Sequence, residues 1–309
     1  MRSRLFFLLI FLFITTACSD FSGNEDDVDD SLEQDTTPAY QDLNGITFGN
    51  NTFISVGTSG SVRVSTDDGT SWEDATPDTS RNLFEITYGN QYFVTVGQSG
   101  TIYYSNDNGS SWNSGTWDES STLYGVAYGN STFVALGSRF IKSDDHGLNW
   151  TTVSTANLYD VTFGNSTFVG CGADGAIYTS SDNGDTWITR DSNTNNDLNH
   201  VTFGNNIFFA VGYGGKLIKS ENDGSTWSEV NSTVTKHLYS IAYGNGIFVG
   251  VGSNTVIVST DNGASFVEKI DNISFTDVTF GNGKFVASGS DEIIYTSTDG
   301  DTWTQVHPE

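Results

Sequence analysis

Apolar residues alternate with polar or small residues in short runs along most of the chain. In the first such stretch, Ile46 and Phe48 flank Thr47, a Gly-Asn pair ends the run, and a second run covers Phe53 to Val56. Alternation with a period of two is typical of half-buried β-strands, and Gly and Asn tolerate the positive φ that hairpin turns require. The pattern therefore predicts short antiparallel strands joined by tight turns.

This pattern recurs seven times, in units of 35 to 40 residues. In the first unit we expect four strands, A to D, over 43–48, 52–57, 61–65 and the residues from Trp72 onward. Four-stranded units of this length that repeat seven times are typical of a β-propeller, whereas a solenoid would need distinct capping repeats. The units begin at Leu43, Leu83, Leu123, Leu158, Leu198, Leu238 and Phe275.

We therefore predict an all-β fold, a seven-bladed β-propeller of four-stranded antiparallel blades over 43–309. Since the last unit contains its own Trp303 strand, we expect the ring to close without a swapped strand, although Tyr40 and its neighbours could still join its ends. Cys171, the only cysteine within the repeats, falls where other units carry Val, Leu or Ser, so we expect a small buried hydrophobic residue there.

The predicted C-to-D turns share the approximate motif Ser-x-Asp-x-Gly-x-Ser/Thr-Trp. The departures are Asn149 for Ser/Thr in the third turn, Asn222 for Asp in the fifth, Phe266 for Trp in the sixth and a deletion near Asp299 in the seventh. Ser and Asp can accept hydrogen bonds from the turn's own N–H groups, and the aromatic ring can pack into the blade. Calcium is the alternative, but one or two carboxylates rarely suffice. The residues with this structural role are Asp67, Trp72, Asp107, Trp112, Asp145, Trp150, Asp182, Trp187, Asn222, Trp227, Asp261, Phe266, Asp299 and Trp303.

These turns resemble the Asp-box, or BNR, repeat of sialidase-like β-propellers, and the resemblance runs from Leu43 to the end of the chain. The units also resemble the repeats of photosystem II stability/assembly factors, which are propellers that assist assembly without catalysis. The sialidase resemblance implies a Tyr nucleophile paired with a Glu, an Asp acid/base and three Arg that clamp a substrate carboxylate.

The arginine clamp is what this chain lacks. Beyond residue 18 the sequence has only Arg63, Arg81, Arg139 and Arg190, and none begins an inner strand. Without bidentate arginines, an acidic protein should repel an anionic sugar. We therefore expect a non-catalytic binding or assembly propeller, with a sialidase-like glycoside hydrolase as the alternative.

Charge and composition exclude other classes. The chain has 12 Lys and Arg against 38 Asp and Glu, for a net charge of −26, and nucleic-acid binding depends on basic residues. Its 21 Phe, 13 Tyr and 7 Trp exclude a disordered acidic chain. The four His residues show no metal-ligand spacing, so we expect no metal and no cofactor. We expect a monomer whose partner is a glycan or a protein.

The N-terminal sequence predicts where in the cell the protein is located. Two arginines precede the apolar run Leu5 to Ile14, which is too short to span a bilayer and is typical of a signal peptide. Thr15-Thr16-Ala17-Cys18 resembles a bacterial lipobox, which implies lipidation of Cys18 and a signal peptide over 1–18. A plain signal peptide with an incidental Cys is the alternative, because Thr15 stands where lipoboxes usually carry Leu.

The acidic segment 19–42 follows, and its like charges predict a flexible tether, with a surface-export signal as the sharper alternative. The expected location is the bacterial cell envelope, lipid-anchored at the outer membrane and facing the periplasm or the surface.

The units differ most where a ligand could bind. In a blade of strands A to D, the D-to-A linkers and B-to-C turns share one face of the disc, and the two residues after each opening Leu or Phe vary near the mouth of the channel. Solvated positions that are free to vary are the alternative. The candidate ligand-binding residues are Glu85, Tyr124, Tyr159, Asp160, His200, Tyr239 and Asp277, with Trp117 and Arg139 on loops of the same face.

Overall fold

The computed structural model describes residues 41–308 except 118, 231 and 271. The described residues belong to one compact unit, which spans Tyr40–Glu309. The predicted signal peptide, Cys18 and nearly all of the predicted tether lie outside the described residues. Among the described residues, no helix is both long enough and apolar enough to cross a membrane.

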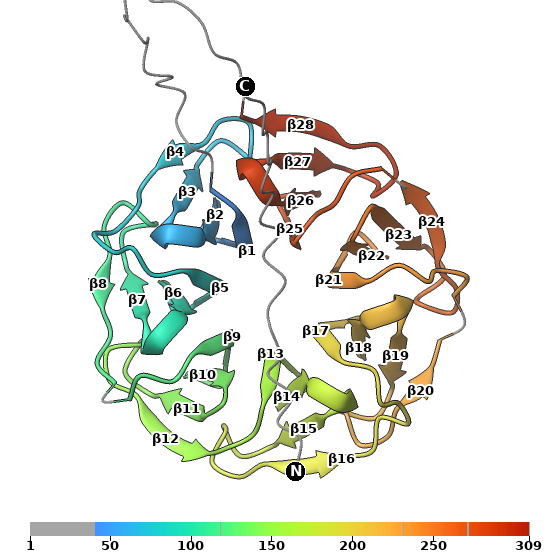
Figure 1. The fold of residues 1–309 in the computed structure, drawn as a ribbon, viewed down its shortest axis with the longest axis horizontal. Helices are drawn as coiled ribbons and strands as arrows, with labels where there is room; N and C mark the ends of the chain where they lie inside the picture. The colour runs from blue at the N-terminus through green and yellow to red at the C-terminus, as the bar shows by residue number, and fades with distance from the viewer. Residues whose placement is uncertain (1–40, 118, 231, 271, 309) are drawn as a thin grey trace, which may run out of the picture. The chain divides into compact units, whose positions relative to one another are not determined.

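Seven antiparallel sheets of four strands surround a central axis, which confirms the predicted seven-bladed propeller (Figure 1). Blade 1 is β1-β2-β3-β4, and the later blades follow in chain order, so that blade 7 is β25-β26-β27-β28. Every blade is built from one continuous segment of chain. The ring therefore closes without a swapped strand, as the repeat pattern predicted.

The inner two strands of each blade are the longest. The innermost strands are β1 (Leu43–Gly49), β5 (Leu83–Gly89), β9 (Leu123–Gly129), β13 (Leu158–Gly164), β17 (Leu198–Gly204), β21 (Leu238–Gly244) and β25 (Asp277–Gly281). The second strands are β2 (Thr52–Gly57), β6 (Tyr92–Gly97), β10 (Thr132–Gly137), β14 (Thr167–Gly172), β18 (Ile207–Gly212), β22 (Ile247–Gly252) and β26 (Lys284–Ser288).

The outer two strands are shorter. The third strands are β3 (Val62–Ser65), β7 (Ile102–Ser105), β11 (Phe140–Ser143), β15 (Ile177–Ser180), β19 (Leu217–Ser220), β23 (Thr255–Ser259) and β27 (Ile294–Ser297). The outermost strands are β4 (Glu73–Asp74), β8 (Asn113–Ser114), β12 (Thr151–Ser154), β16 (Ile188–Arg190), β20 (Ser228–Glu229), β24 (Val267–Ile270) and β28 (Thr304–His307). Five B-to-C turns are 3-10 turns: η1 (Thr58–Gly60), η2 (Gln98–Gly100), η3 (Ala173–Gly175), η4 (Tyr213–Gly215) and η5 (Ser290–Glu292).

Three predicted strand starts were wrong by one or two residues. Strand C of the first blade begins at Val62 rather than at residue 61, and strand D begins at Glu73, after Trp72. The Trp72 indole N–H donates to the carbonyl of Gly69, so this residue belongs to the turn. The seventh inner strand begins at Asp277 rather than at Phe275, whose ring is fully buried.

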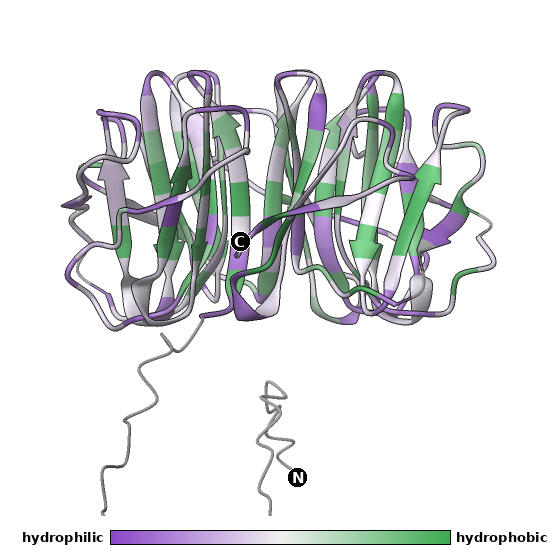
Figure 2. Ribbon diagram, turned by 90° about the horizontal axis from the view of Figure 1, so that it is seen from above, coloured by the Kyte–Doolittle hydropathy of each residue, from purple (hydrophilic) through white to green (hydrophobic). Residues whose placement is uncertain are grey.

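The hydrophobic core lies between neighbouring blades. Val94 and Val96 of blade 2 pack in one cluster with Leu123 and Val126 of blade 3, and similar clusters recur around the ring. Figure 2 shows that the hydrophobic residues concentrate in the strands, between the two layers of turns. Buried Cys171, whose thiol lies 3.5 Å from the carbonyl of Leu198 in the next blade, belongs to this packing.

One face of the disc, which we call the repeat face, carries the A-to-B and C-to-D turns. In the first blade Asp67 Oδ1 accepts hydrogen bonds from the Ser65 hydroxyl (2.8 Å) and the Ser71 N–H (2.9 Å), while Gly69 N–H donates to Ser65 Oγ. Asn222 makes the equivalent contacts through its amide oxygen, which accepts from the N–H of Thr226. The conserved geometry explains why each residue type of the motif recurs at its position.

Asparagines in the A-to-B turns join each blade to the next on this face. Asn50 Nδ2 donates to Asn108 Oδ1 (2.7 Å) in the C-to-D turn of the following blade, and Asn130 does the same to Asn183 (3.1 Å). The exception is Asn245, which donates to the carbonyl of Gly283 instead. The seventh C-to-D turn is one residue short, and the missing residue is the one that would accept this bond.

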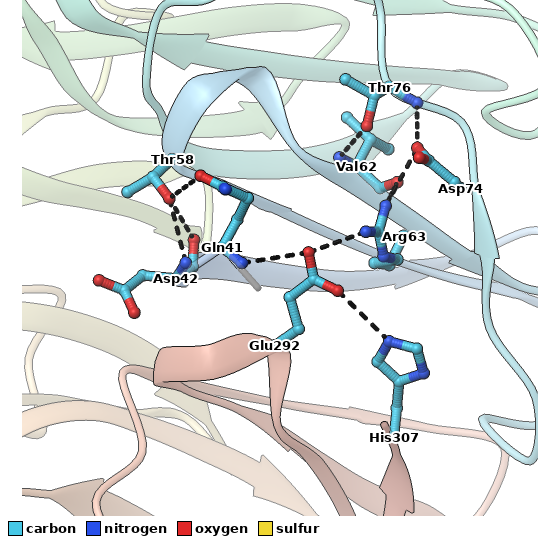
Figure 3. A network of polar contacts seen from close by, with 9 residues as sticks. All are labelled: Gln41, Asp42, Thr58, Val62, Arg63, Asp74, Thr76, Glu292 and His307. Carbon is cyan, nitrogen blue, oxygen red and sulfur yellow. Dashed lines mark hydrogen bonds and ion pairs between the residues drawn. The ribbon is translucent and has the colours of Figure 1, made fainter. Parts of the chain in front are cut away.

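The ends of the ring meet in a polar network between blades 7 and 1 (Figure 3). Glu292 is 3% exposed, and its carboxylate binds the Arg63 guanidinium at 2.8 Å and accepts the N–H of Gln41. The N–H of Glu292 in turn donates to the carbonyl of Gln41 (2.8 Å). Gln41, directly after Tyr40, therefore helps to join the two ends, as we considered from the sequence.

Candidate functional site: the axial cavity

The opposite face, which we call the mouth face, carries the B-to-C turns and the D-to-A linkers. These two kinds of segment bind each other across neighbouring blades. The N–H of Ser59 in η1 donates to Asn82 Oδ1 (3.0 Å), and the N–H of Asp174 in η3 donates to Asp197 Oδ1 (2.8 Å). The linkers are thereby held against the rim, next to the start of each inner strand.

The second residue of each inner strand is a β-bulge in the first six blades. In blade 1, Leu43 pairs with Gly57 and Gly45 pairs with Val56, which leaves Asn44 unpaired between them. A bulge bends the strand and redirects a side chain. The bulged residues are Asn44, Phe84, Tyr124, Tyr159, Asn199 and Tyr239.

Bulged side chains reach toward the next blade. Asn44 donates to the carbonyl of Leu83 at 2.8 Å. On blades 2 to 4 the ring centroids of Phe84 and Tyr124 are 5.5 Å apart, and those of Tyr124 and Tyr159 are 6.1 Å apart. We call Phe84, Tyr124 and Tyr159 the aromatic arc. It follows the rim of the mouth over three consecutive blades.

Acidic groups surround one end of the aromatic arc. Burial, followed by the charges of Asp197, Tyr124, Tyr213 and Asp174, raises the pKa of Tyr159 to about 12. The phenol therefore stays protonated at any physiological pH and can donate a hydrogen bond.

The third residues of the first six inner strands and Asp277, the first residue of β25, form a second ring, and several of them bind the N–H of the next blade. Asp160 Oδ2 accepts from Val201 N–H at 2.8 Å, and Asp277 Oδ2 accepts from Ile46 N–H at 2.7 Å, which also closes the propeller. His200 Nδ1 lies 3.4 Å from the N–H of Ile241. The seven residues are Gly45, Glu85, Gly125, Asp160, His200, Ser240 and Asp277.

The two glycines of this ring provide space for carboxylates. A Cβ atom on Gly45 would lie 3.2 Å from Glu85 Oε1, and one on Gly125 would lie 3.0 Å from Asp160 Oδ1. Glu85 also departs from the pattern, because its carboxylate accepts its own neighbour's N–H, that of Ile86, at 2.9 Å. Its charge is therefore not used to bind the next blade.

Four predicted site residues line one cavity on the propeller axis, of about 250 Å³: Glu85, Asp160, His200 and Asp277. Asp160 and Asp277 are 5% and 3% exposed. His200 Nε2 lies 3.5 Å from Asp160 Oδ2, and His200 is the only basic side chain lining the cavity among the described residues. Three carboxylates thus share one imidazole.

Burial is the largest influence on all three carboxylates and raises their pKa values. The pKa of Glu85 lies well above its usual value, because the charges of Asp277 and Asp160 add to burial. His200 and backbone N–H groups partly offset the effect of burial on the pKa of Asp160 and of Asp277, which are still raised. Burial, with Asp160 second, also raises the pKa of the Cys171 thiol well above its ordinary value.

Glu85, Asp160 and His200 have donor atoms within 4.8 Å of one another, a grouping that linear spacing did not predict. One zinc ion would require donor atoms at most about 4.4 Å apart. Ile241 N–H points at His200 Nδ1, which places the ring proton on Nε2 and leaves that atom without a lone pair for a metal. The set would therefore have to rearrange to hold zinc. Calcium takes six to eight oxygen ligands, and within this set only the carboxylates of Glu85 and Asp160 supply oxygen.

Two predicted site residues lie elsewhere. Trp117 follows the bridge between Thr116 and Asn149 and lines a separate hollow of about 440 Å³ with Arg81 and Glu119. Arg139 forms an ion pair with Glu119 at 2.8 Å. These residues join blades 2 and 3 and do not line the axial cavity.

Comparisons with known proteins agree with the fold. A family model described as the DUF6242 beta propeller domain matches residues 161–276. Among solved structures, YCF48 from Cyanidioschyzon merolae is 17% identical with a TM-score of 0.70, covering 84% of this chain and 96% of that chain. A structure titled YCF48 bound to D1 peptide is 18% identical, also with a TM-score of 0.70, over 84% of this chain and 92% of that chain.

The WD40 beta propeller domain of Doa1 is 17% identical with a TM-score of 0.67, over 83% of this chain and 92% of that chain. A search of curated proteins found no match. At these identities the likeness extends to the fold alone.

Proposed function

We propose that this protein is a non-catalytic binding or assembly propeller that engages a protein partner through its mouth face. One observation carries the proposal: the inner-strand residues that surround the mouth differ from blade to blade, whereas the turns of the repeat face are nearly the same in every blade. Residues with a structural role recur in every blade, whereas residues that bind an asymmetric ligand must differ between blades. Half-buried aromatic groups, such as those of the aromatic arc, beside carboxylates with raised pKa values are typical of binding sites.

A peptide is a suitable partner for this fold. The structure titled YCF48 bound to D1 peptide is a propeller that holds a peptide, and the photosystem II assembly factors resemble these repeats. Since the likeness to that structure concerns only the fold, peptide binding by the present chain is a proposal. A glycan is the alternative partner, because the rings of the aromatic arc could stack on sugars.

We give the repeat-face turns an Asp-box identity with a purely structural role. The axial carboxylates argue against sialidase-like chemistry. Glycosidases place two carboxyl groups beside a sugar-sized opening, whereas Asp160 and Asp277 are buried and bind backbone N–H groups of the next blade. A fluorogenic sialoside hydrolysed by the wild type, but not by variants of Tyr124, Tyr159 or Tyr239, would reverse this ranking.

The proposed location is the bacterial cell envelope, with the monomeric propeller anchored through lipid on Cys18. Metabolic labelling with an alkyne fatty acid tests this directly. The wild type should be labelled and should sediment with membranes, whereas Cys18→Ala should do neither. Equal labelling of both chains would exclude this anchor.

The binding proposal is tested on arrays of random peptides and of glycans probed with the purified full chain. We expect peptide binding that Tyr159→Ala weakens and that Tyr92→Ala, a matched change at the start of β6 beside the repeat face, leaves unchanged. Binding of glycans alone would make the partner a glycan. The proposal fails if the wild type binds neither array, or if both variants bind as well as the wild type.

A further inference from the structure

Tyr213, which lies within electrostatic range of Tyr159 of the aromatic arc, forms an exposed aromatic pair with His237. Tyr213 in η4 is 46% exposed, and its ring centroid lies 4.4 Å from that of His237. Tyr159 lies within electrostatic range of Asp174 and Asp197, which are bound to each other through a backbone N–H. An aromatic face beside carboxylates attracts cations, because the ring faces and the acids both carry negative potential.

The axial cavity begins one residue further along the same strands, at Glu85 and Asp160. It holds three carboxylates and one imidazole, and the charge of Glu85 binds no backbone N–H beyond its own neighbour's. Buried carboxylates without enough partners destabilise a fold. Gly45 and Gly125 maintain the space that these side chains occupy. Burying these carboxylates without a cation therefore destabilises the fold, and a bound cation would reduce that free-energy cost.

The cavity's size favours part of a side chain over a free small molecule. Its volume of about 250 Å³ lies below the roughly 300–1,000 Å³ typical of small-molecule pockets. A metal ion fits less well than a hydrogen-bond donor, because His200 Nε2 carries the ring proton when Ile241 N–H binds Nδ1. An ammonium or guanidinium group needs only acceptor oxygens, which Glu85 and Asp160 provide.

We infer that the mouth takes up a lysine or arginine side chain of a protein partner, with the partner's backbone against the aromatic arc and the cationic group in the axial cavity between Glu85 and Asp160. This inference rests on the proposed function and specifies its partner. It joins two features that are independent in the sequence, the bulged aromatic residues and the acidic residues that follow them. The acidity of the whole chain, at −26, would bring a basic segment toward this face.

The test uses the full chain on the random peptide array at 150 mM salt, where screening reduces attraction by distant charges. We expect binders enriched in Lys or Arg. Replacing one basic residue of a binder by norleucine, or by citrulline for Arg, should weaken it about tenfold, as loss of a charge-assisted hydrogen bond does. Glu85→Gln keeps the acceptor for Ile86 N–H and should remove this preference.

Glu73→Gln is the matched control, because it removes the same charge from an exposed position on β4. Asp160→Asn, whose amide oxygen can still accept the N–H of Val201, is the second variant in case Glu85→Gln fails to fold, which circular dichroism would detect. Binders without a basic preference, or a preference that survives Glu85→Gln and Asp160→Asn, would overturn this inference and leave the proposed function intact. Stoichiometric calcium binding that Glu85→Gln abolishes and that peptides do not displace would assign the cavity to a metal instead. The absence of any binder would refute the proposed function itself.

Discussion

The two faces of the propeller use the same residue type in opposite ways. On the repeat face, hydrogen bonds from Ser71 and Ser65 hold the pKa of exposed Asp67 at about 2. At the axis, burial raises the pKa of Asp160 despite its contacts with His200 and backbone N–H groups. The comparison teaches that ionisation of the repeat-face carboxylates stabilises the fold, whereas ionisation of the axial carboxylates opposes it. Charges retained at a cost to folding are typical of functional sites.

The largest effect should come from the repeat face. Trp150 is 6% exposed, and its indole N–H donates to the carbonyl of Gly147 at 2.9 Å. Trp150→Ala should cost about 3–5 kcal/mol of unfolding free energy and lower the Tm by roughly 10 °C in scanning calorimetry. Tyr213→Ala on the mouth face should change stability by less than about 0.5 kcal/mol. Equal losses in both variants would remove the distinction between the faces.

The network between blades 7 and 1 is an exception on the mouth face, since it serves folding. Glu292→Ala should cost about 2 kcal/mol, less than the 3–5 kcal/mol of a fully buried pair, because Arg63 keeps Asp74 at 3.0 Å. Glu292 has φ +58°, so Glu292→Gly should recover about 1 kcal/mol of that loss by removing backbone strain. Urea unfolding measures both variants, and a glycine variant less stable than the alanine variant would contradict this account.

The ring could be predicted from the sequence because all seven units repeat the same alternation of apolar residues and the same turns. A seven-bladed propeller is the fold that this repetition favours. Variation at the second and third positions of each inner strand also indicated the mouth residues. Sequence spacing alone could not reveal that Glu85, Asp160 and His200 meet. They lie in three different blades, and the distances between them depend on how the side chains turn inside the closed ring.

Two departures from the repeat, Glu292 and the deletion near Asp299, also indicate special contacts. Glu292 stands where η1, η2, η3 and η4 end in glycine, and a Glu in a glycine position indicates a special role. The deletion near Asp299 removes the residue that would accept the hydrogen bond from Asn245, which donates to Gly283 instead. Each departure is visible in the sequence when the seven units are aligned with one another.

The axial carboxylates should make stability depend on pH in an unusual direction. Glu85 has a raised pKa in the folded state, so its contribution is complete below the unfolded value near 4.5 and is lost as the pH rises through the folded pKa. The pKa values of Asp160 and Asp277, which line the same cavity, are also raised by burial. Glu85→Gln should therefore be more stable than the wild type at pH 8, with a gain that shrinks toward pH 4.5. A Tm difference that is negative at pH 8 would refute the idea that this charge opposes folding.

The smallest effect should come from exchanging Asp and Asn in the repeat-face turns. Asn222 already accepts the N–H of Thr226 at 3.0 Å, so an amide can replace the carboxylate in this geometry. Asp67→Asn should cost less than about 1 kcal/mol at pH 7, because the site is exposed and its charge is screened.

The effect should also depend on pH. Since the pKa of Asp67 is lowered to about 2, the contribution of its charge to stability is present above the unfolded value of 3.8 and is lost as the pH falls through 2. The wild type should therefore lose its advantage over Asp67→Asn between pH 4 and pH 2, and Asn222→Asp should gain stability over the same interval as the pH rises. Acid unfolding curves of the three chains measure this, and a pH-independent difference between Asp67→Asn and the wild type would mean that the turn needs the shape of the side chain and not its charge.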